Sequence, residues 1–423
     1  MAQAAIAGTG QDASQAQPQQ AAPGSLFGVP KYSTQRRFVL DNGNQALAAV
    51  PIGGSQVNVP TTRLDQLDIV QGIKVAVQYA GTWTNTGGGL AVSKFFPSNI
   101  VQQITFKLQA AYNTFNLTGP LASIIQAFRP MWGSRQLGPV FPDAFSQLGS
   151  NNPTFGAAFN ATYNIDIPFA VKFDEYFDLT AQGDPTRKVY DAIVSPMYMA
   201  AQARVVVPTI TLAPQLATGD LLGSPVSRPG TDVTSTYTAG AFACEMARDA
   251  YWTANSPAAN PPQYPWIYTR DYFTQPTAGQ AKVGCLIQNT GVSVGQVMSL
   301  FGFVWDPQAN AGLGAVVPMS SISSFEIVTG GSLQNIQMTP QQLTDKMRSQ
   351  FGVNFLEDVN FPSGIFVFDW AMNPDGGYLS NADCINTYLV NGVQLNITFK
   401  AGSVPSATST VYLGVEALKL ATS

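Results

Sequence analysis

Long stretches of this chain alternate apolar and polar residues one by one, and this period of two constrains the fold more than any other feature. The sequence VQLNITF at 393–399 alternates without a break, and 411–417 follows the same pattern. Residues 67–79 and 100–108 repeat it over most of their length. Successive side chains of a β-strand point to opposite faces, so these segments are predicted to be strands with one buried face.

Other segments indicate strands of a different kind. The sequence GIFVFDW at 364–370 is a continuous apolar run, which is typical of a strand covered on both faces. Runs at 283–288 and 297–304 also indicate strands. Within a further alternating segment, 165–173, Pro168 lacks a backbone N–H, so that strand is expected at a sheet edge or a bulge.

Helix signals are few and similarly placed in the two halves. Asp184-Pro185 and Thr339-Pro340 each put a capping residue before a proline suited to the first helical position. Thr339 and Gln342 have the spacing of a capping box. A third short helix is expected at 120–128, where another proline begins the segment. Each half therefore contains strands, a proline-started helix and then an apolar strand.

This repeated order predicts an all-β chain of two sandwiches with short helices in loops. The proline-rich segment 254–265 lies between the halves and is interpreted as the linker. We expect an N-terminal arm at 1–40, a first sandwich at 41–253 and a second at 254–423.

The chain carries little charge. Only 11% of its residues are charged, where soluble domains have about 25%. Neutral amides and hydroxyls cost less to desolvate than ions, so this surface suits a protein that packs against copies of itself. The net charge is −4 and no run of Lys and Arg occurs, so direct nucleic-acid binding is not expected.

The residue types that usually carry catalysis or bind metals are scarce. The chain has no histidine, which removes the commonest general base and metal ligand. Its cysteines, Cys244, Cys285 and Cys384, are far apart and form no CxxC motif, so they are interpreted as small buried apolar residues. No catalytic residue, metal or cofactor is predicted, and the chain is expected not to be an enzyme.

Two alternatives stay open: a secreted β-sandwich carbohydrate-binding protein and a glycoside hydrolase. The N-terminal sequence MAQAAIAGTGQ has neither the basic nor the apolar region of a secretory signal, which counts against secretion. A hydrolase needs two convergent carboxyl groups. The cluster Asp174, Glu175 and Asp178 is a candidate, but it follows a predicted strand and is interpreted as a solvated loop.

The arm has its own composition. Residues 1–24 are rich in Ala and Gln and lack the apolar content to fold alone. The next residues combine cations with apolar anchors, which suits contact with either an anionic membrane or a neighbouring subunit. These candidate contact residues are Phe27, Lys31, Arg36, Arg37 and Phe38.

Several segments together carry a resemblance to a known family. They are LDIVQGIKVAV at 67–77, FPSNIVQ at 96–102, MTPQQLTDKMRSQFG at 338–352, FPSGIFVFDW at 361–370 and TVYLGVEAL at 410–418. In order and spacing, from Thr61 to Leu420, the chain resembles the tectivirus-type double jelly-roll major capsid proteins of tailless bacterial viruses with an internal membrane. The arm and an insert at 213–240 depart from that pattern.

The resemblance implies two tandem eight-stranded jelly rolls and a structural role in the virion. It implies homotrimers that form pseudo-hexagonal tiles of an icosahedral shell around a membrane and the genome. The implied partners are copies of the chain, minor capsid and vertex proteins, and peripherally the membrane. Synthesis is then expected in the cytoplasm of the host.

Overall fold

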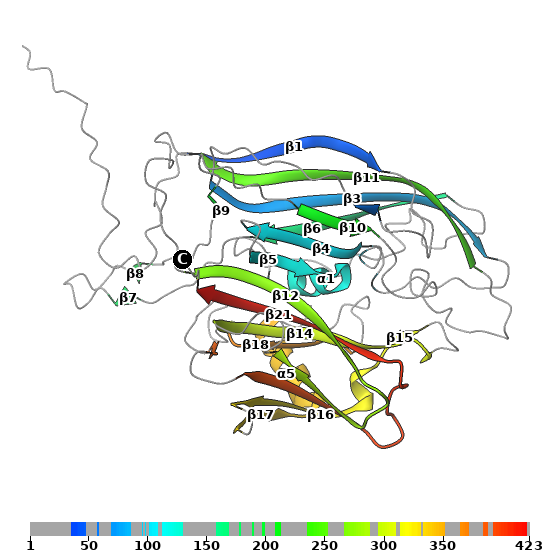
Figure 1. The fold of residues 1–423 in the computed structure, drawn as a ribbon, viewed down its shortest axis with the longest axis vertical. Helices are drawn as coiled ribbons and strands as arrows, with labels where there is room; N and C mark the ends of the chain where they lie inside the picture. The colour runs from blue at the N-terminus through cyan, green and yellow to red at the C-terminus, as the bar shows by residue number, and fades with distance from the viewer. Residues whose placement is uncertain are drawn as a thin grey trace, which may run out of the picture.

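The computed structural model of the 423-residue chain contains three sheets of four or more strands and two α-helices among the residues it describes (Figure 1). The described residues are 35–47, 57–58, 69–85, 95, 98, 101–108, 112–129, 158–168, 177–178, 188–189, 197–198, 208–212, 235–252, 266–287, 295–309, 314–330, 333–351, 364–371, 384–387 and 392–420.

A five-stranded antiparallel sheet belongs to the first half of the chain. Its path runs through four strands, and a fifth short strand pairs with β3. In sheet order they are β1 (Gln35–Leu47), β11 (Ser235–Trp252), β3 (Ile69–Asn85) and β6 (Ala158–Pro168), with β9 (Met197–Tyr198) beside β3.

A ten-stranded sheet contains strands from both halves. Its first-half strands are β5 (Tyr112–Leu117), β4 (Val101–Leu108), β10 (Pro208–Leu212) and β2 (Val57–Asn58). Its second-half strands are β15 (Ala315–Val316), β14 (Gln296–Asp306), β21 (Thr410–Leu420) and β12 (Trp266–Pro276), with β18 (Phe366–Asp369) and β19 (Ile385–Asn386) paired to β14.

The remaining strands form a four-stranded sheet in the second half and a small hairpin in the first. The four-stranded sheet has the order β13 (Lys282–Leu286), β20 (Val393–Phe399), β16 (Ile322–Thr329) and β17 (Leu333–Met338). The hairpin pairs β7 (Phe177–Asp178) with β8 (Lys188–Val189). A 3-10 turn, Met319–Ser321, precedes β16.

The two α-helices begin where the sequence predicts. Helix α1 (Gly119–Phe128) has Thr118 as its N-cap, whose hydroxyl accepts a hydrogen bond from the Leu121 N–H at 3.4 Å. Helix α5 (Pro340–Phe351) has a reciprocal capping box. There the Thr339 N–H donates to Oε1 of Gln342 at 2.9 Å, and the Gln342 N–H donates to Oγ1 of Thr339 at 3.3 Å.

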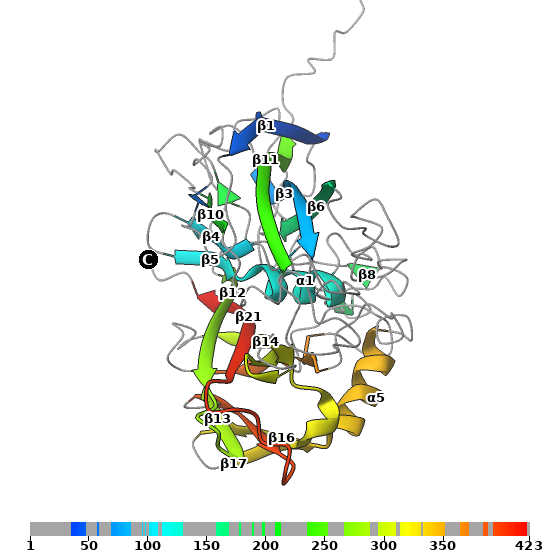
Figure 2. The same ribbon diagram turned by 90° about the vertical axis from the view of Figure 1, so that its right-hand side faces the viewer.

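The apolar strands β14 and β18 are buried on both faces, as continuous apolar runs predict. On one face, the Phe325 ring of β16 lies 5.3 Å from that of Phe366 and 5.6 Å from that of Phe368. On the other face, the Phe128 ring of α1 lies 5.3 Å from that of Phe301. The second-half part of the ten-stranded sheet is therefore a layer between its own four-stranded sheet and a helix of the first half (Figures 1 and 2).

Several predictions of local structure are confirmed and one is wrong. The strand predicted at 393–399 is β20 with the same bounds. The prediction of a helix that starts at Asp184-Pro185 is wrong for Lys188 and Val189, which form the strand β8. Their pairing with Phe177 and Asp178 overrides the local helix signals. The strand predicted at 165–173 is β6 up to Pro168, the last residue of β6.

Candidate functional site: the buried junction between the two halves

The two halves meet within the ten-stranded sheet. Strand β12 of the second half runs parallel to β5 of the first, through the residue pair Arg270–Phe115. Strand β5 continues into α1, which packs over the same part of the sheet (Figures 1 and 2). The junction therefore has a backbone component, the shared sheet, and a side-chain component beneath α1.

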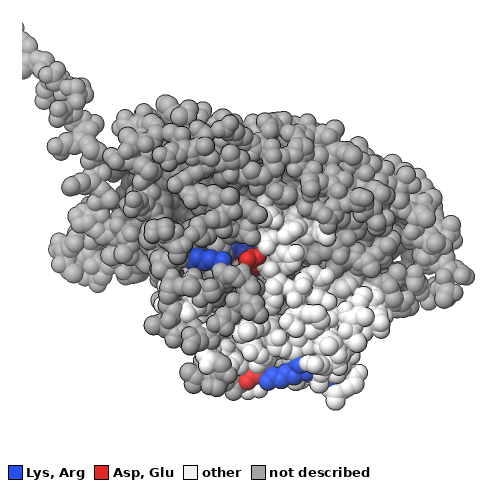
Figure 3. Space-filling view, in the orientation of Figure 1, with Lys and Arg blue, Asp and Glu red and all other residues white. Residues whose placement is uncertain are grey.

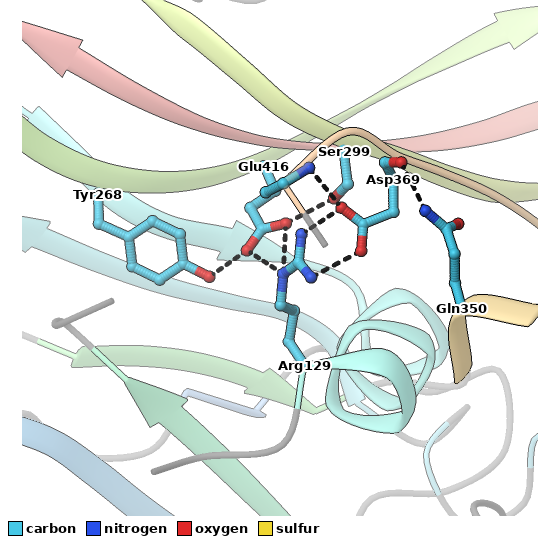
Figure 4. A network of polar contacts seen from close by, with 7 residues as sticks. Arg129, Tyr268, Ser299, Gln350, Asp369 and Glu416 are labelled. Carbon is cyan, nitrogen blue, oxygen red and sulfur yellow. Dashed lines mark hydrogen bonds and ion pairs between the residues drawn. The ribbon is translucent and has the colours of Figure 1, made fainter. Parts of the chain in front are cut away.

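Arg129 connects the halves by its side chain. It is the C-cap of α1, and its backbone N–H donates to the Ile125 carbonyl at 2.7 Å. Its guanidinium donates from both terminal nitrogens to Asp369 on β18, at 2.6 and 2.7 Å. Its Nε lies 3.0 Å from both carboxylate oxygens of Glu416 on β21 (Figure 4). The side chain of Arg129 is 7% exposed and those of its two partners are 0% exposed.

Other donors complete the shells of the two carboxylates. The Tyr268 hydroxyl and the Ser299 hydroxyl each donate to Glu416 at 2.6 Å. The Ala371 N–H donates to the side chain of Asp369 at 2.9 Å. These contacts meet the condition under which a protein interior tolerates charge, which is pairing together with hydrogen bonding.

The environment shifts the pKa values of these groups in different directions. Burial raises the pKa of the Glu416 carboxyl, but the Arg129 guanidinium and the hydroxyl donors outweigh it, so this pKa lies below its ordinary value. At Asp369 burial outweighs the attraction of Arg129, so the pKa is raised. Burial and the negative charge of Glu416 both raise the pKa of the Tyr268 phenol, which keeps its proton as a donor.

A second buried cation, Arg270, lies at the parallel pair itself. It is 1% exposed, and its guanidinium carbon lies 4.8 Å from the Phe115 ring centre and 4.2 Å from that of Tyr268. Burial lowers its pKa, while Tyr268 and Glu416 act in the opposite direction. Arg270 and Glu416 are directly opposite each other on the paired strands β12 and β21. The cations Arg129 and Arg270 and the carboxylates Asp369 and Glu416 therefore share this region.

A smaller polar contact joins the halves nearer to solvent. Nδ2 of Asn116 on β5 donates to Asp271 on β12 at 2.7 Å, and Nε2 of Gln103 donates to the Asn116 amide oxygen at 2.7 Å. Burial raises the pKa of Asp271, and the bond from Asn116 partly offsets this. The side chain of Asn116 therefore bridges β5 and β12.

The junction is suited to holding two halves together and not to catalysis. A carboxylate that acts on a substrate must reach it. Both carboxylates here are 0% exposed and paired with Arg129, and Glu416 also accepts hydrogen bonds from Tyr268 and Ser299. Their ion pairs and hydrogen bonds hold α1, β12, β14, β18 and β21 together.

None of the described residues that the sequence singled out for contact belongs to this junction. Of the five candidate arm residues, Phe27 and Lys31 lie outside the described residues. Arg36, Arg37 and Phe38 lie in β1, whose backbone pairs with β11. Strand β1 thus begins at Gln35, inside the range predicted for the arm.

The acidic cluster and the cysteines are only partly described. Asp178 lies in β7, whereas Asp174 and Glu175 lie outside the described residues. Cys285 is buried, which fits the interpretation of a small apolar residue, whereas Cys384 is partly exposed, so the same interpretation is wrong for Cys384. Within the described ranges, no group of three or more Cys, Asp or Glu side chains is placed to hold a metal ion. No helix in that part of the chain is long and apolar enough to cross a membrane.

Sequence reasoning missed the junction residues, although two signals were present. Asp369 directly follows the continuous apolar residues 365–368, and a charge at the end of a buried strand implies a buried partner. The alternation at 411–417 predicts one buried face, yet Glu416, which lies on the opposite face, is buried as well because α1 covers that face with Arg129. Nothing in the local pattern marks Arg129, which is 287 residues from Glu416.

Comparison with solved structures identifies the fold. The major capsid protein of STIV matches with a TM-score of 0.53 and 11% identity, covering 91% of this chain and 97% of the other. A chain of Sulfolobus Turreted Icosahedral Virus matches with a TM-score of 0.51 and 11% identity, over 91% of each chain. A chain of the PBCV-1 virus capsid matches with a TM-score of 0.51 and 13% identity, over 92% of this chain and 95% of the other.

Comparison by sequence gave no match, either to protein-family models or to curated proteins. The likeness therefore rests on the arrangement of strands across nearly the whole chain. It confirms the prediction of two tandem jelly rolls with short helices. The chain has the double jelly-roll fold found in these viral major capsid proteins.

Proposed function

We propose that this chain is the major capsid protein of a virus and acts by self-assembly. The observation that carries the proposal is the structural match to the STIV major capsid protein, which covers 91% of this chain and 97% of the other. The low charge adds support. Most of the described surface on the face seen in Figure 3 is neither acidic nor basic, as suits a surface that is covered by copies of itself.

The assembled unit that we propose is a homotrimer. Three chains with two jelly rolls each supply six similar sandwiches, which form a pseudo-hexagonal tile. Closed threefold symmetry satisfies a head-to-tail interface without leaving a free edge. We expect each contact between subunits to bury roughly 2,000–5,000 Å², the range of obligate interfaces. The buried junction supports this proposal because a tile requires both sandwiches of a chain in a fixed relation.

The wider setting follows from the resemblance of the sequence to capsid proteins of bacterial viruses. We propose that the tiles cover an icosahedral shell around an internal membrane and the genome, and contact minor capsid and vertex proteins. The chain is then synthesised in the host cytoplasm and resides in the virion. It does not bind nucleic acid directly.

The division of the chain is also a proposal. We assign the first jelly roll to residues up to 253 and the second to 254–423, with the linker at 254–265. Since β1 begins at Gln35, we now end the arm at residue 34. Phe27 and Lys31 then belong to the arm that contacts a membrane or a neighbour, while Arg36, Arg37 and Phe38 lie at its point of attachment.

Analytical ultracentrifugation of the purified chain, followed by negative-stain imaging, tests the proposal. We expect a species of three times the 45.0 kDa monomer mass at micromolar protein, with a six-lobed outline in projection. A dominant monomer at that concentration would overturn the capsid assignment. A dimer or tetramer with the same fold would refute the tile while leaving self-assembly in place.

A further inference from the structure

The last strand of the chain occupies a central position in the sheet that joins the halves. Strand β21 lies between β12 and β14. It pairs with β12 from Trp266–Leu420 to Pro276–Thr410. On its other side it pairs with β14 from Gln296–Leu418 to Trp305–Thr410. Almost the whole length of β21 is therefore hydrogen-bonded on both sides.

Without β21 the ten-stranded sheet falls into two parts. Strand β12 would remain beside β5, and thus with the first half, through the pair Arg270–Phe115. Strand β14 would remain with β15, β18 and β19. No other strand in the described part of the sheet connects these two groups, since β21 alone separates β12 from β14.

Glu416 makes the same strand the centre of the side-chain network. Its carboxylate accepts from Arg129 after α1, from Tyr268 on β12 and from Ser299 on β14 (Figure 4). These donors come from both halves of the chain and from both parts of the sheet. Gly414, two residues earlier, leaves room for the ring of Phe301, which contacts Phe128 of α1.

We infer that β21 is the closing strand of the fold: β12, β14 and α1 become a stable junction only when β21 inserts between the two strands and brings Glu416 to Arg129. A chain that ends before residue 410 would lack this strand and would not reach the state with both halves fixed. Insertion of β21 is a folding event and does not depend on the proposed capsid role.

Refolding of the full-length chain by dilution from denaturant, with pulsed hydrogen–deuterium labelling and mass spectrometry, tests the order of events. We expect amides of β12, β14 and β21 to become protected in one phase. Amides of β16 and β20, which pair with each other and not with β21, form a separate internal reference. Protection of β12 and β14 in a phase that precedes β21 would overturn the inference.

A matched pair of variants identifies the contribution of the network. Glu416→Gln removes the negative charge from the closing strand, and we expect it to slow the shared phase at least several-fold. Glu326→Gln makes the same change at a carboxylate of the four-stranded sheet, which is paired with the half-exposed Lys282, and we expect the shared phase to keep its rate. Equal effects of the two variants would count against the role of Glu416.

A nicked chain provides a measurement that does not depend on a variant folding well. A protease site inserted at Gly402, an exposed turn with no atom within 4 Å of a side chain placed there, allows cleavage of the folded full-length protein. After unfolding and dilution, we expect protection of β12 and β14 to return at a rate that rises with fragment concentration. A rate independent of concentration would show that the junction closes without β21.

Discussion

Substitution of Arg129 by Met is the sharpest test of the junction. Methionine keeps an unbranched apolar side chain beside Phe128 but removes the guanidinium. The carboxylates of Asp369 and Glu416, both 0% exposed, then lose their shared cation. Glu416 keeps the hydroxyl donors of Tyr268 and Ser299, whereas Asp369 loses the two hydrogen bonds from the Arg129 guanidinium.

The expected loss is large for a single substitution. Removing one partner of a buried ion pair costs about 3–5 kcal/mol, because the charge that stays behind is uncompensated. The whole free energy of unfolding of a domain is about 5–15 kcal/mol. We therefore expect Arg129→Met to remove a substantial part of the free energy of unfolding, measured by urea denaturation at one fixed protein concentration.

The loss should depend on pH in a defined direction. In the variant, burial without Arg129 raises the pKa of both carboxyls above their ordinary values of 3.8 and 4.5. A carboxyl whose pKa is raised in the folded state destabilises the fold while it is ionised. This destabilisation disappears as the pH falls toward the pKa of the same carboxyl in the unfolded chain. The difference between wild type and Arg129→Met should therefore narrow from about pH 7 to about pH 5.

Arg348→Met is the matched control. Arg348 on α5 pairs with Asp345 at 3.3 Å, but the two side chains are 43% and 56% exposed. An exposed pair on a helix contributes only about 0.3–0.5 kcal/mol. If Arg129→Met costs no more than Arg348→Met, or if its cost does not change with pH, the reasoning on the buried network is refuted.

Three further predictions concern single features. Burial raises the pKa of the Cys285 thiol to about 12, so at about pH 8 only about one molecule in ten thousand carries the thiolate. Peptide-resolved iodoacetamide labelling of the native chain should therefore modify Cys384 well before Cys285, and equal labelling rates would contradict the burial of Cys285. Gly414→Val places a side chain against the ring of Phe301, and such overpacking should cost about 1–3 kcal/mol in urea denaturation; an unchanged midpoint would show that the strand tolerates the bulk. Deletion of residues 1–34 should leave the thermal midpoint of the purified protein nearly unchanged and abolish closed shells in negative-stain images. Normal shells would show that the arm is not needed for assembly, and loss of folding would show that it is part of the core.

The parts of the fold that depend on local sequence could be predicted. Alternation places β20 at Val393–Phe399 because a period of two has a direct physical cause in the pleated backbone. The capping box of α5 follows from Thr339 and Gln342 because the contact is made within one helical turn.

The parts that depend on distant contacts could not be predicted. Lys188 and Val189 follow a good helix start, yet pairing with Phe177 and Asp178 makes them a strand. The contacts of the junction are still harder to predict from local sequence, because Arg129 and Glu416 are separated by most of the chain. Periodicity tells which face of β21 is polar, but it does not tell that another element covers that face.

The parallel pairing of β12 with β5 has a consequence for how any assembly of this chain acquires curvature. Adjacent strands are twisted by about 20–25° on average relative to each other, and their hydrogen bonds limit how far that twist can change. The angle between the two sandwiches is therefore set within one sheet and not by the length of the connecting segment 254–265. Insertions in that segment would leave the angle unchanged, and bending of a larger surface must arise where one chain meets the next.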